Sequence, residues 1–257
     1  MGGRGQRLVR AGTVFPGTRF PNRMIPANAG AQPPVVTPGQ PVPAVTQQQL
    51  QNMTDAEFAT YLAGLKSTPI DPNTYYNNDW DTQRLIANMP ELNRAPQVVD
   101  AQTFKSMPGK ALYRTVNQTG SQSAVEICGR TMTSDVTTIG EGVMGDGFYF
   151  ANNLSTSQAG YGRTRGNITK TATMQVKLNQ NARVVNNVTL HSMLAGESRT
   201  VRDAVRGMTS GGSWVGDSGL MAYALRKGYN VVERSGSTYN IIDRSAATFS
   251  GEIVPWT

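Results

Sequence analysis

The sequence contains one cysteine, Cys128, and one histidine, His191, among its 257 residues. A single cysteine excludes an internal disulfide, and the pair cannot assemble a His/Cys metal site. His191 falls at the start of an expected helix, where packing is its expected role, and nothing in the sequence supports a Ser-His-acid hydrolase. No apolar run approaches the roughly 20 residues of a membrane span, so no membrane contact is expected.

Acidic residues are absent from positions 1–54, although this segment contains five arginines. These are Arg4, Arg7, Arg10, Arg19 and Arg23. They supply five of the seven net positive charges, because the remainder has 19 basic residues (24 less five) against 17 acidic ones. The basic character therefore belongs to the N-terminal segment and not to a face of a folded domain.

Residues 1–50 also hold eight of the fourteen prolines. Such a segment buries too little apolar surface to offset its ordering entropy, which predicts an extended or disordered tail. Its arginines could contact nucleic-acid phosphates or an acidic groove on a partner protein. Aromatic residues for base stacking are sparse, since only Phe15 and Phe20 occur there. This favours a protein anchor over specific DNA recognition.

The rest of the chain divides into a short helical connector, 51–97, and a domain, 98–257. In the connector, Thr54 and Glu57 have the spacing of a capping box, and a second helix is expected over 81–89. In the domain, strands are expected near 111–116, 147–151, 172–178, 183–186, 229–234, 238–243 and 247–254. Helices are expected near 121–128, 155–160, 199–206 and 218–227. The pattern predicts an α+β fold with many short strands.

The stretch GDGFYFANNLSTSQAGY, residues 145–161, combines an aromatic strand with a polar turn and a helix start. This arrangement would place Tyr149, Ser157 and Tyr161 on one concave surface. Two tyrosines can stack on a flat ring, and a serine between them can bond a carboxamide. The stretch therefore fits nicotinamide, although an ordinary core strand with a capped helix is the alternative interpretation.

This stretch resembles the nicotinamide-binding signature of the ADP-ribosyltransferase superfamily, with one extra residue between Ser157 and Tyr161. The resemblance implies two small packed β-sheets around a cleft that binds NAD as substrate. Tyr149 and Tyr161 would stack on nicotinamide, and Ser157 would bond its amide. Ser155-Thr156-Ser157 also matches the middle motif of the cholera-toxin-like branch.

Arg114 lies between apolar neighbours in the expected strand KALYRTV, residues 110–116. An arginine inside a half-buried strand needs an anion or a carbonyl, unless it lies in solvent at a sheet edge. The superfamily carries an arginine or histidine at this place, so the resemblance assigns Arg114 to the ribose or phosphates of NAD. An edge position in solvent is the alternative.

The C-terminal run from Gly228 to Ser250 predicts a helix cap at Gly228 and two strands paired around Ser235-Gly236-Ser237. It resembles the superfamily strand that bears the catalytic glutamate, but Thr238 stands at that position. Possible substitutes are Glu233, Glu252, Glu126 and Glu141. A threonine supplies no negative charge, and losing such a charge costs about 10²–10³ in rate.

The chain also resembles proteins of bacteriophages of Gram-positive hosts, in its glycine-rich basic N-terminus and in Asn78–Gln83. Together these patterns predict a virion-associated protein that transfers mono-ADP-ribose from NAD to a protein or nucleic acid, including a host protein after injection into the cytoplasm. The alternative is an inactive structural component of the capsid, head decoration or portal vertex. In either case the tail would bind capsid or portal proteins.

Overall fold

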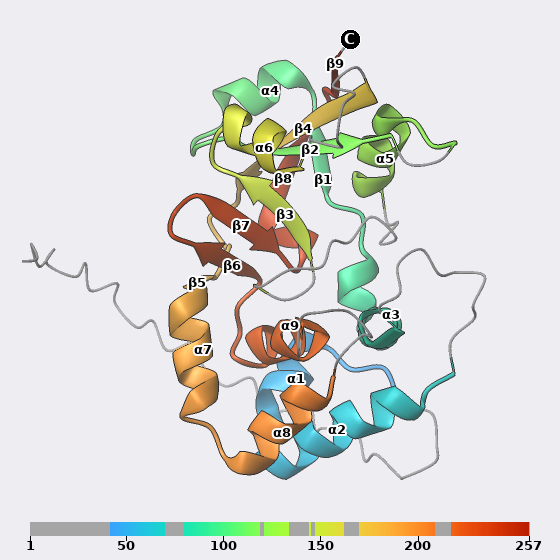
Figure 1. The fold of residues 1–257 in the computed structure, drawn as a ribbon, viewed down its shortest axis with the longest axis vertical. Coiled ribbons are helices and arrows are strands. Elements are labelled where there is room, and N and C mark those ends of the chain that lie inside the picture. Colours follow the sequence, from blue (N-terminus) through green and yellow to red (C-terminus); the bar gives the residue numbers. More distant parts are fainter. Residues whose placement is uncertain are drawn as a thin grey trace, which may run out of the picture. The chain divides into compact units, whose positions relative to one another are not determined.

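Helices and strands are interspersed along the chain in an α+β fold with a mixed β-sheet (Figure 1). The computed structural model describes residues 42–69, 80–118, 121–133, 144, 147–161, 170–208 and 217–256. All of these belong to one unit, residues 31–257. Most of the expected tail therefore lies outside the described residues.

The helices are α1 (Gln47–Asn52), α2 (Asp55–Ser67), α3 (Trp80–Asn88), α4 (Ala101–Ser106), α5 (Ala124–Thr131), α6 (Leu154–Tyr161), α7 (Asn187–Ala195), α8 (Arg199–Gly207) and α9 (Asp217–Arg226), with short 3₁₀ turns η2 (Pro90–Asn93) and η4 (Arg244–Ala246). The strands are β1 (Gln97–Val99), β2 (Leu112–Asn117), β3 (Phe148–Ala151), β4 (Thr171–Leu178), β5 (Val184–Asn186), β6 (Val231–Arg234), β7 (Thr238–Ile241), β8 (Ala247–Ser250) and β9 (Val254–Trp256).

The described strands run in the order β1-β8-β4-β2-β3-β7-β6-β5, with β9 also paired to β4. Pairing is antiparallel except for β1 with β8 and β5 with β6. Strands β2 and β3 share a single residue pair, Tyr113 opposite Ala151, whereas β2 and β4 pair along six residues. The sheet therefore consists of two groups of strands that are joined at one point.

Helices cover both faces of the β2–β4 region. Helix α6 packs on β2, and α5 packs on β4 and β2 from the opposite side (Figure 1). Helix α4 is fixed by Lys177 of β4, whose buried ammonium donates to the carbonyls of Phe104 at 2.8 Å and Met107 at 2.7 Å. A cation at the last carbonyls of a helix is favourable because it satisfies orphan acceptors.

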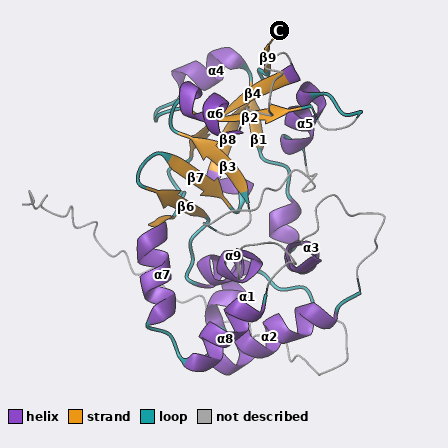
Figure 2. Ribbon diagram, in the orientation of Figure 1, coloured by secondary structure: helices purple, strands orange, loops and turns teal. Residues whose placement is uncertain are grey.

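The helices from the two ends of the described chain form one group (Figure 2). Helix α1 contacts α9, α2 contacts α8 and α3, and α3 contacts α9. Leu50, Phe58 and Leu65 are buried here together with Val205 and Leu225. The segment expected as a connector thus shares an apolar core with α8 and α9 of the expected domain.

Local sequence signals account for many of the boundaries. Thr54 forms the predicted capping box with Glu57, and Gly228, at φ +83°, ends α9 as predicted. Strands β6 and β7 pair around Ser235 and Gly236, which both have positive φ, also as predicted.

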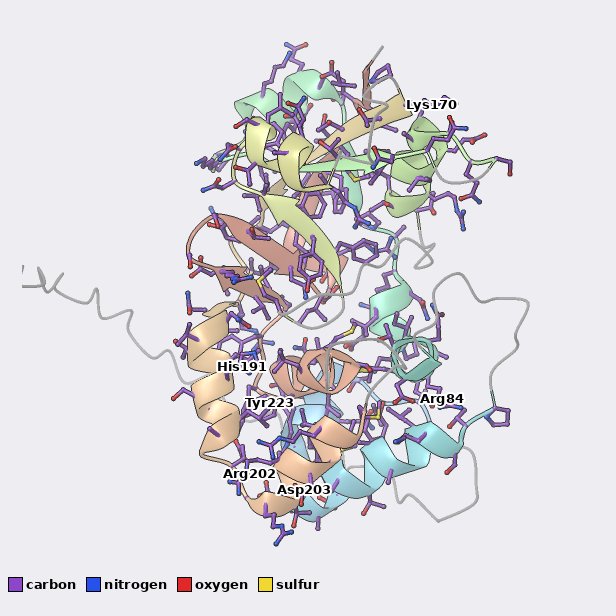
Figure 3. All side chains as sticks on the ribbon, in the orientation of Figure 1. Arg84, Lys170, His191, Arg202, Asp203 and Tyr223 are labelled. Carbon is purple, nitrogen blue, oxygen red and sulfur yellow. The ribbon has the colours of Figure 1, made fainter. Side chains whose placement is uncertain are left out.

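Two expectations about the elements are wrong. The strand expected over 247–254 is divided into β8 and β9, and between them Gly251 donates its N–H to the Val99 carbonyl of β1 at 2.7 Å. His191 does not pack in the core: it is exposed on α7 (Figure 3). The residue of α7 that is buried is its neighbour, Leu190.

Candidate functional site

The sharp turn from β3 into α6 forms as the sequence predicts. The Oδ1 atom of Asn153 accepts the N–H of Thr156 at 2.7 Å, which caps the first turn of the helix. Asn152 donates its backbone N–H to the carbonyl of Ser237 at 2.9 Å and its side-chain amide to that of Gly236 at 2.5 Å. The β6–β7 hairpin therefore holds the turn that positions α6.

Ser157 of α6 lies in the protein interior and not on an accessible surface. Its side chain is 0% exposed, and its Oγ donates to Oγ1 of Thr115 at 3.0 Å. Thr115 is 1% exposed and shares a 2.8 Å hydrogen bond with Thr173, its register partner on β4. The hydroxyl proposed for a carboxamide is thus engaged within the fold and sealed from solvent.

Tyr149 of β3 is also buried, with 9% of its surface exposed. Its hydroxyl accepts the backbone N–H of Met144 at 3.3 Å. The Met144 carbonyl accepts the side-chain amide of Asn240 at 3.1 Å, and Asn240 lies opposite Tyr149 across β3 and β7. The backbone of Met144 therefore links β3 to β7, and its N–H takes up the Tyr149 hydroxyl in a hydrogen bond.

Arg114 of β2 is half-buried and lies over the ring of Phe148, 5.5 Å from its centroid. The edge-strand alternative is excluded by its pairing, because β2 has β4 on one side and β3 on the other. Burial raises the pKa of the Cys128 thiol to about 12, while the nearby charge of Arg114 acts to lower it. The guanidinium therefore lies on the α5 side of β2.

Arg244 is a second cation at the same aromatic ring. It is 1% exposed, and its guanidinium lies 4.8 Å from the centroid of Phe148. Its Nη1 donates to the carbonyls of Thr131 at 2.9 Å and Thr133 at 2.6 Å, at the C-terminal end of α5. Arg244 was not predicted as a site residue.

The predicted site residues divide between the two faces of the sheet. Side chains alternate along a strand, so Tyr149 points away from the face that Phe148 and Arg114 share. The pairs Ala151–Thr238 and Phe150–Tyr239 place Thr238 on the Tyr149 face of β7. Ser157 belongs to that face too, through its bond to Thr115.

Glu233 lies on the Arg114 face, because it is paired with Tyr239. Its Oε1 accepts the side-chain amide of Asn186 at 2.6 Å, and its Oε2 accepts the N–H of Gly236 at 2.7 Å. Burial raises the pKa of Tyr239, and the charge of Glu233 raises it further. This carboxylate therefore stabilises the β6–β7 turn and does not share a face with Tyr149 and Ser157.

The other proposed acids are dispersed. Glu126 closes the capping box of α5, where its carboxylate accepts hydrogen bonds from the backbone N–H and the hydroxyl of Ser123. These bonds hold the pKa of Glu126 below its ordinary value. Glu252 is exposed between β8 and β9. Glu141 lies outside the described residues, as does the side chain of Tyr161, the last residue of α6.

Thr115, like Arg244, was not predicted from the sequence as a site residue. Alternation along β2 is enough to place its side chain on the same face as that of Tyr113 and on the other face from that of Arg114. Its contact with Ser157, however, depends on how α6 packs on β2. Among the described residues, no three His, Cys, Asp or Glu side chains are grouped as metal ligands would be. The described helices include none with the length and apolarity to cross a membrane.

Comparisons of the chain with protein-family models, with curated proteins and with solved structures find no match.

Proposed function

We propose that this chain is a structural protein of a bacteriophage particle, with an ADP-ribosyltransferase-like domain that has lost NAD binding and turnover. The observation that carries the proposal is the state of Ser157, which is fully buried and bonded to Thr115. A hydroxyl that must reach a ligand carboxamide cannot be both sealed from solvent and engaged within the fold, unless the fold opens.

The ADP-ribosyltransferase-like architecture is supported by the division of the sheet. Strands β2 and β3 share one residue pair, which separates two small groups of strands. The strand with the aromatic signature, β3, lies between the Arg114 strand and the strand that begins at Thr238. Three elements singled out by the resemblance are therefore neighbours, although they are far apart in the sequence.

The loss of turnover is supported by the carboxylates. Thr238 provides no charge, and Glu233, the nearest proposed substitute in the sequence, is hydrogen-bonded to Asn186 and Gly236. Transition states of this type need a preorganised negative charge at the reacting centre. Glu233 lies on the opposite face from Tyr149 and Ser157, and Glu126 closes the capping box of α5.

The place in the particle rests on the phage resemblance and on the tail. Five arginines without an acid in residues 1–54 form a segment suited to an acidic groove on a capsid or portal protein. Sedimentation with purified phage particles tests this: the full chain should sediment with them, and a variant without residues 1–41 should not. Equal sedimentation of both would contradict the anchor.

Calorimetry with NAD and with nicotinamide tests the loss of binding. The full-length protein should give no saturable heat, which means a dissociation constant weaker than about 1 mM for either compound. Labelled NAD should leave no radioactivity on phage proteins, host proteins or nucleic acid. Saturable NAD binding, or any labelled acceptor, would contradict the proposal.

A mono-ADP-ribosyltransferase of the virion, active on a host target after injection, is the second candidate. It is favoured by Arg114, a half-buried cation on β2 beside the aromatic strand β3. In this case Arg114→Ala should weaken NAD binding at least tenfold, because a charge-assisted bond contributes about 1.5–3 kcal/mol. Arg199→Ala, at an exposed arginine on α8, is the matched control and should leave NAD binding unchanged.

A further inference from the structure

We propose that the outer face of α8 binds the phosphate backbone of duplex DNA through an arginine row, which consists of Arg199, Arg202 and Arg206. The charges outside residues 1–54 are nearly balanced in total, but this helix gathers three cations and a single acid, Asp203. The total charge therefore did not predict this face. The proposal depends on neither candidate function, because it uses none of the residues assigned to NAD.

The arginine row follows from the residue spacing of α8. Positions i, i+3 and i+7 lie along one side of a helix, and Arg199, Arg202 and Arg206 have this spacing. The opposite side of α8 is buried through Val201 and Val205. Arg199 exposes 88% of its side chain, and Arg206 is exposed too. The row is about 10 Å long, because each residue of a helix advances about 1.5 Å.

Contacts at both ends of α8 hold two cations of this surface in place. The Nη1 atom of Arg202 donates to the carbonyls of Ala195 at 3.2 Å and Glu197 at 2.6 Å, which precede α8 in the chain. At the other end, the exposed Lys66 of α2 donates its ammonium to the carbonyl of Gly207 at 2.7 Å. Lys66 thus adds a fourth cation at the C-terminal end of the row. Side chains that are already held in place lose less entropy when a ligand binds.

The charges of α8 oppose the stability of the helix itself. Positive charges are unfavourable at a helix N-terminus, yet α8 begins with Arg199 and has no acid in its first turn. Like charges one turn apart repel, as those of Arg202 do with Arg199 and with Arg206. Within α8 only Asp203 compensates, through a solvent-exposed ion pair with Arg199 at 3.3 Å. A row of anions along this face would relieve the repulsion.

The chemistry of this face favours a phosphate backbone over a protein or a membrane. A protein interface has an apolar centre, and a helix on a membrane surface inserts apolar side chains. Helix α8, all of which is described, exposes no large apolar side chain. Phosphates require only cations, and those of one DNA strand follow each other about every 3.4 Å along the duplex. About three of them therefore match the length of the arginine row.

Binding of the full-length protein to a labelled duplex of about 20 base pairs, measured by fluorescence anisotropy over a series of salt concentrations, tests the proposal. The double variant Arg199→Gln with Arg206→Gln should bind at least tenfold more weakly. It should also lower the slope of log affinity against log salt by about 1.8, because each phosphate contact contributes about 0.9. The matched control, Arg94→Gln with Arg234→Gln, removes two exposed arginines outside α8. It should change the affinity less than about threefold, because distant charges are screened.

Asp203→Asn tests the same surface through a gain of binding. It removes the carboxylate that repels phosphate and releases Arg199 from its ion pair, so it should tighten DNA binding about threefold or more. Glu252→Gln, at an exposed acid between β8 and β9, is the control and should leave the affinity unchanged. Misfolding cannot produce a gain of binding, so this pair decides the test if the double arginine variant fails to fold.

Wild-type affinity in the folded Arg199→Gln, Arg206→Gln variant would overturn the proposal and assign DNA binding to residues 1–54. Equal weakening in the Arg94→Gln, Arg234→Gln control would overturn it too, since only net charge would then matter. Poly-glutamate that competes as strongly as unlabelled duplex would identify an acidic protein as the partner, and anionic phospholipid vesicles that do so would identify a membrane. Either result would overturn DNA binding and leave the proposed function intact.

Discussion

Gly147 and Asn240 are in such close contact that no side chain fits at position 147. A Cβ atom placed on Gly147 would overlap the Oδ1 atom of Asn240, whose side chain is fully buried and donates to the Met144 carbonyl at 3.1 Å. The glycine before the aromatic strand is therefore required by packing between β3 and β7. A ligand-binding role is not needed to explain it.

Gly147→Ala should destabilise the protein by about 1–3 kcal/mol, the usual cost of forcing extra volume into a packed interior. Urea unfolding followed by circular dichroism measures this. Gly129→Ala on α5 is the matched control: a Cβ there meets no atom within 4 Å, so the variant should be as stable as the wild type or more so. Equal stability of Gly147→Ala and the wild type would contradict the packing argument.

Gly219 has a comparable role where α9 crosses α8. A Cβ at this position would overlap the backbone carbonyl of Val205, which cannot move away as a flexible side chain can. Gly219→Ala should therefore separate the two helices and lower stability by about 2 kcal/mol or more. Gly207→Ala, at the end of α8 with open space around it, controls for the change in helix propensity. A Gly219→Ala variant no less stable than this control would show that α8 and α9 adjust freely.

The fold was predictable from sequence wherever a local pattern determines it. The alternation in β2, the Ser235–Gly236 turn and the capping box at Thr54 all act over a few residues. Strand β1 was not predicted as an element, and α7 begins at Asn187, before the helix start that was expected at His191. The apolar residues of α7 do not gather on one side of the helix, and β1 is a short edge strand with Val98 exposed.

The accessibility of the site residues was less predictable than the helices and strands that carry them. Tyr149, Ser157 and Arg114 were each assigned to the right kind of element, but their accessibility depends on tertiary contacts. Ser157 is closed off by Thr115, and Tyr149 is bonded to Met144. A motif specifies which residues follow one another, and these contacts depend on the register of β2 and the packing of α6. A resemblance in sequence therefore could not distinguish an open pocket from a filled one.

Tyr61 on α2 carries a hydroxyl that has no hydrogen-bond partner among the described residues, although its side chain is 0% exposed. Burial raises its pKa, so the phenol stays neutral. Tyr61→Phe should leave stability unchanged or increase it by up to about 1 kcal/mol, because it removes an unsatisfied buried group. In Tyr223→Phe, by contrast, a 2.8 Å bond to Glu197 is lost and stability should fall by about 1 kcal/mol. Thermal unfolding of both variants measures the contrast, and a larger loss for Tyr61→Phe would contradict it.

Glu197 makes the stability of the helical group depend on pH in the acid range. Burial alone would raise its pKa, but hydrogen bonds from Lys227, at 2.5 Å, and from Tyr223 outweigh burial and hold the pKa below its ordinary value of 4.5. A carboxylate with a lowered pKa in the folded state stabilises the protein above its unfolded pKa, and this contribution is lost as the pH falls through the folded pKa. The contribution should therefore be complete at pH 7 and should decrease below about pH 4.5.

Glu197→Gln should cost about 1 kcal/mol at neutral pH, through the loss of charge-assisted bonds, and this difference from the wild type should shrink as the solution is acidified. Urea unfolding at a series of pH values from 7 to below 4 measures it. Asp203→Asn on α8 is the control, because its ion pair with Arg199 is solvent-exposed and contributes little (Figure 3). A Glu197→Gln difference that stays constant across this pH range would show that the loss comes from packing and not from the carboxylate charge.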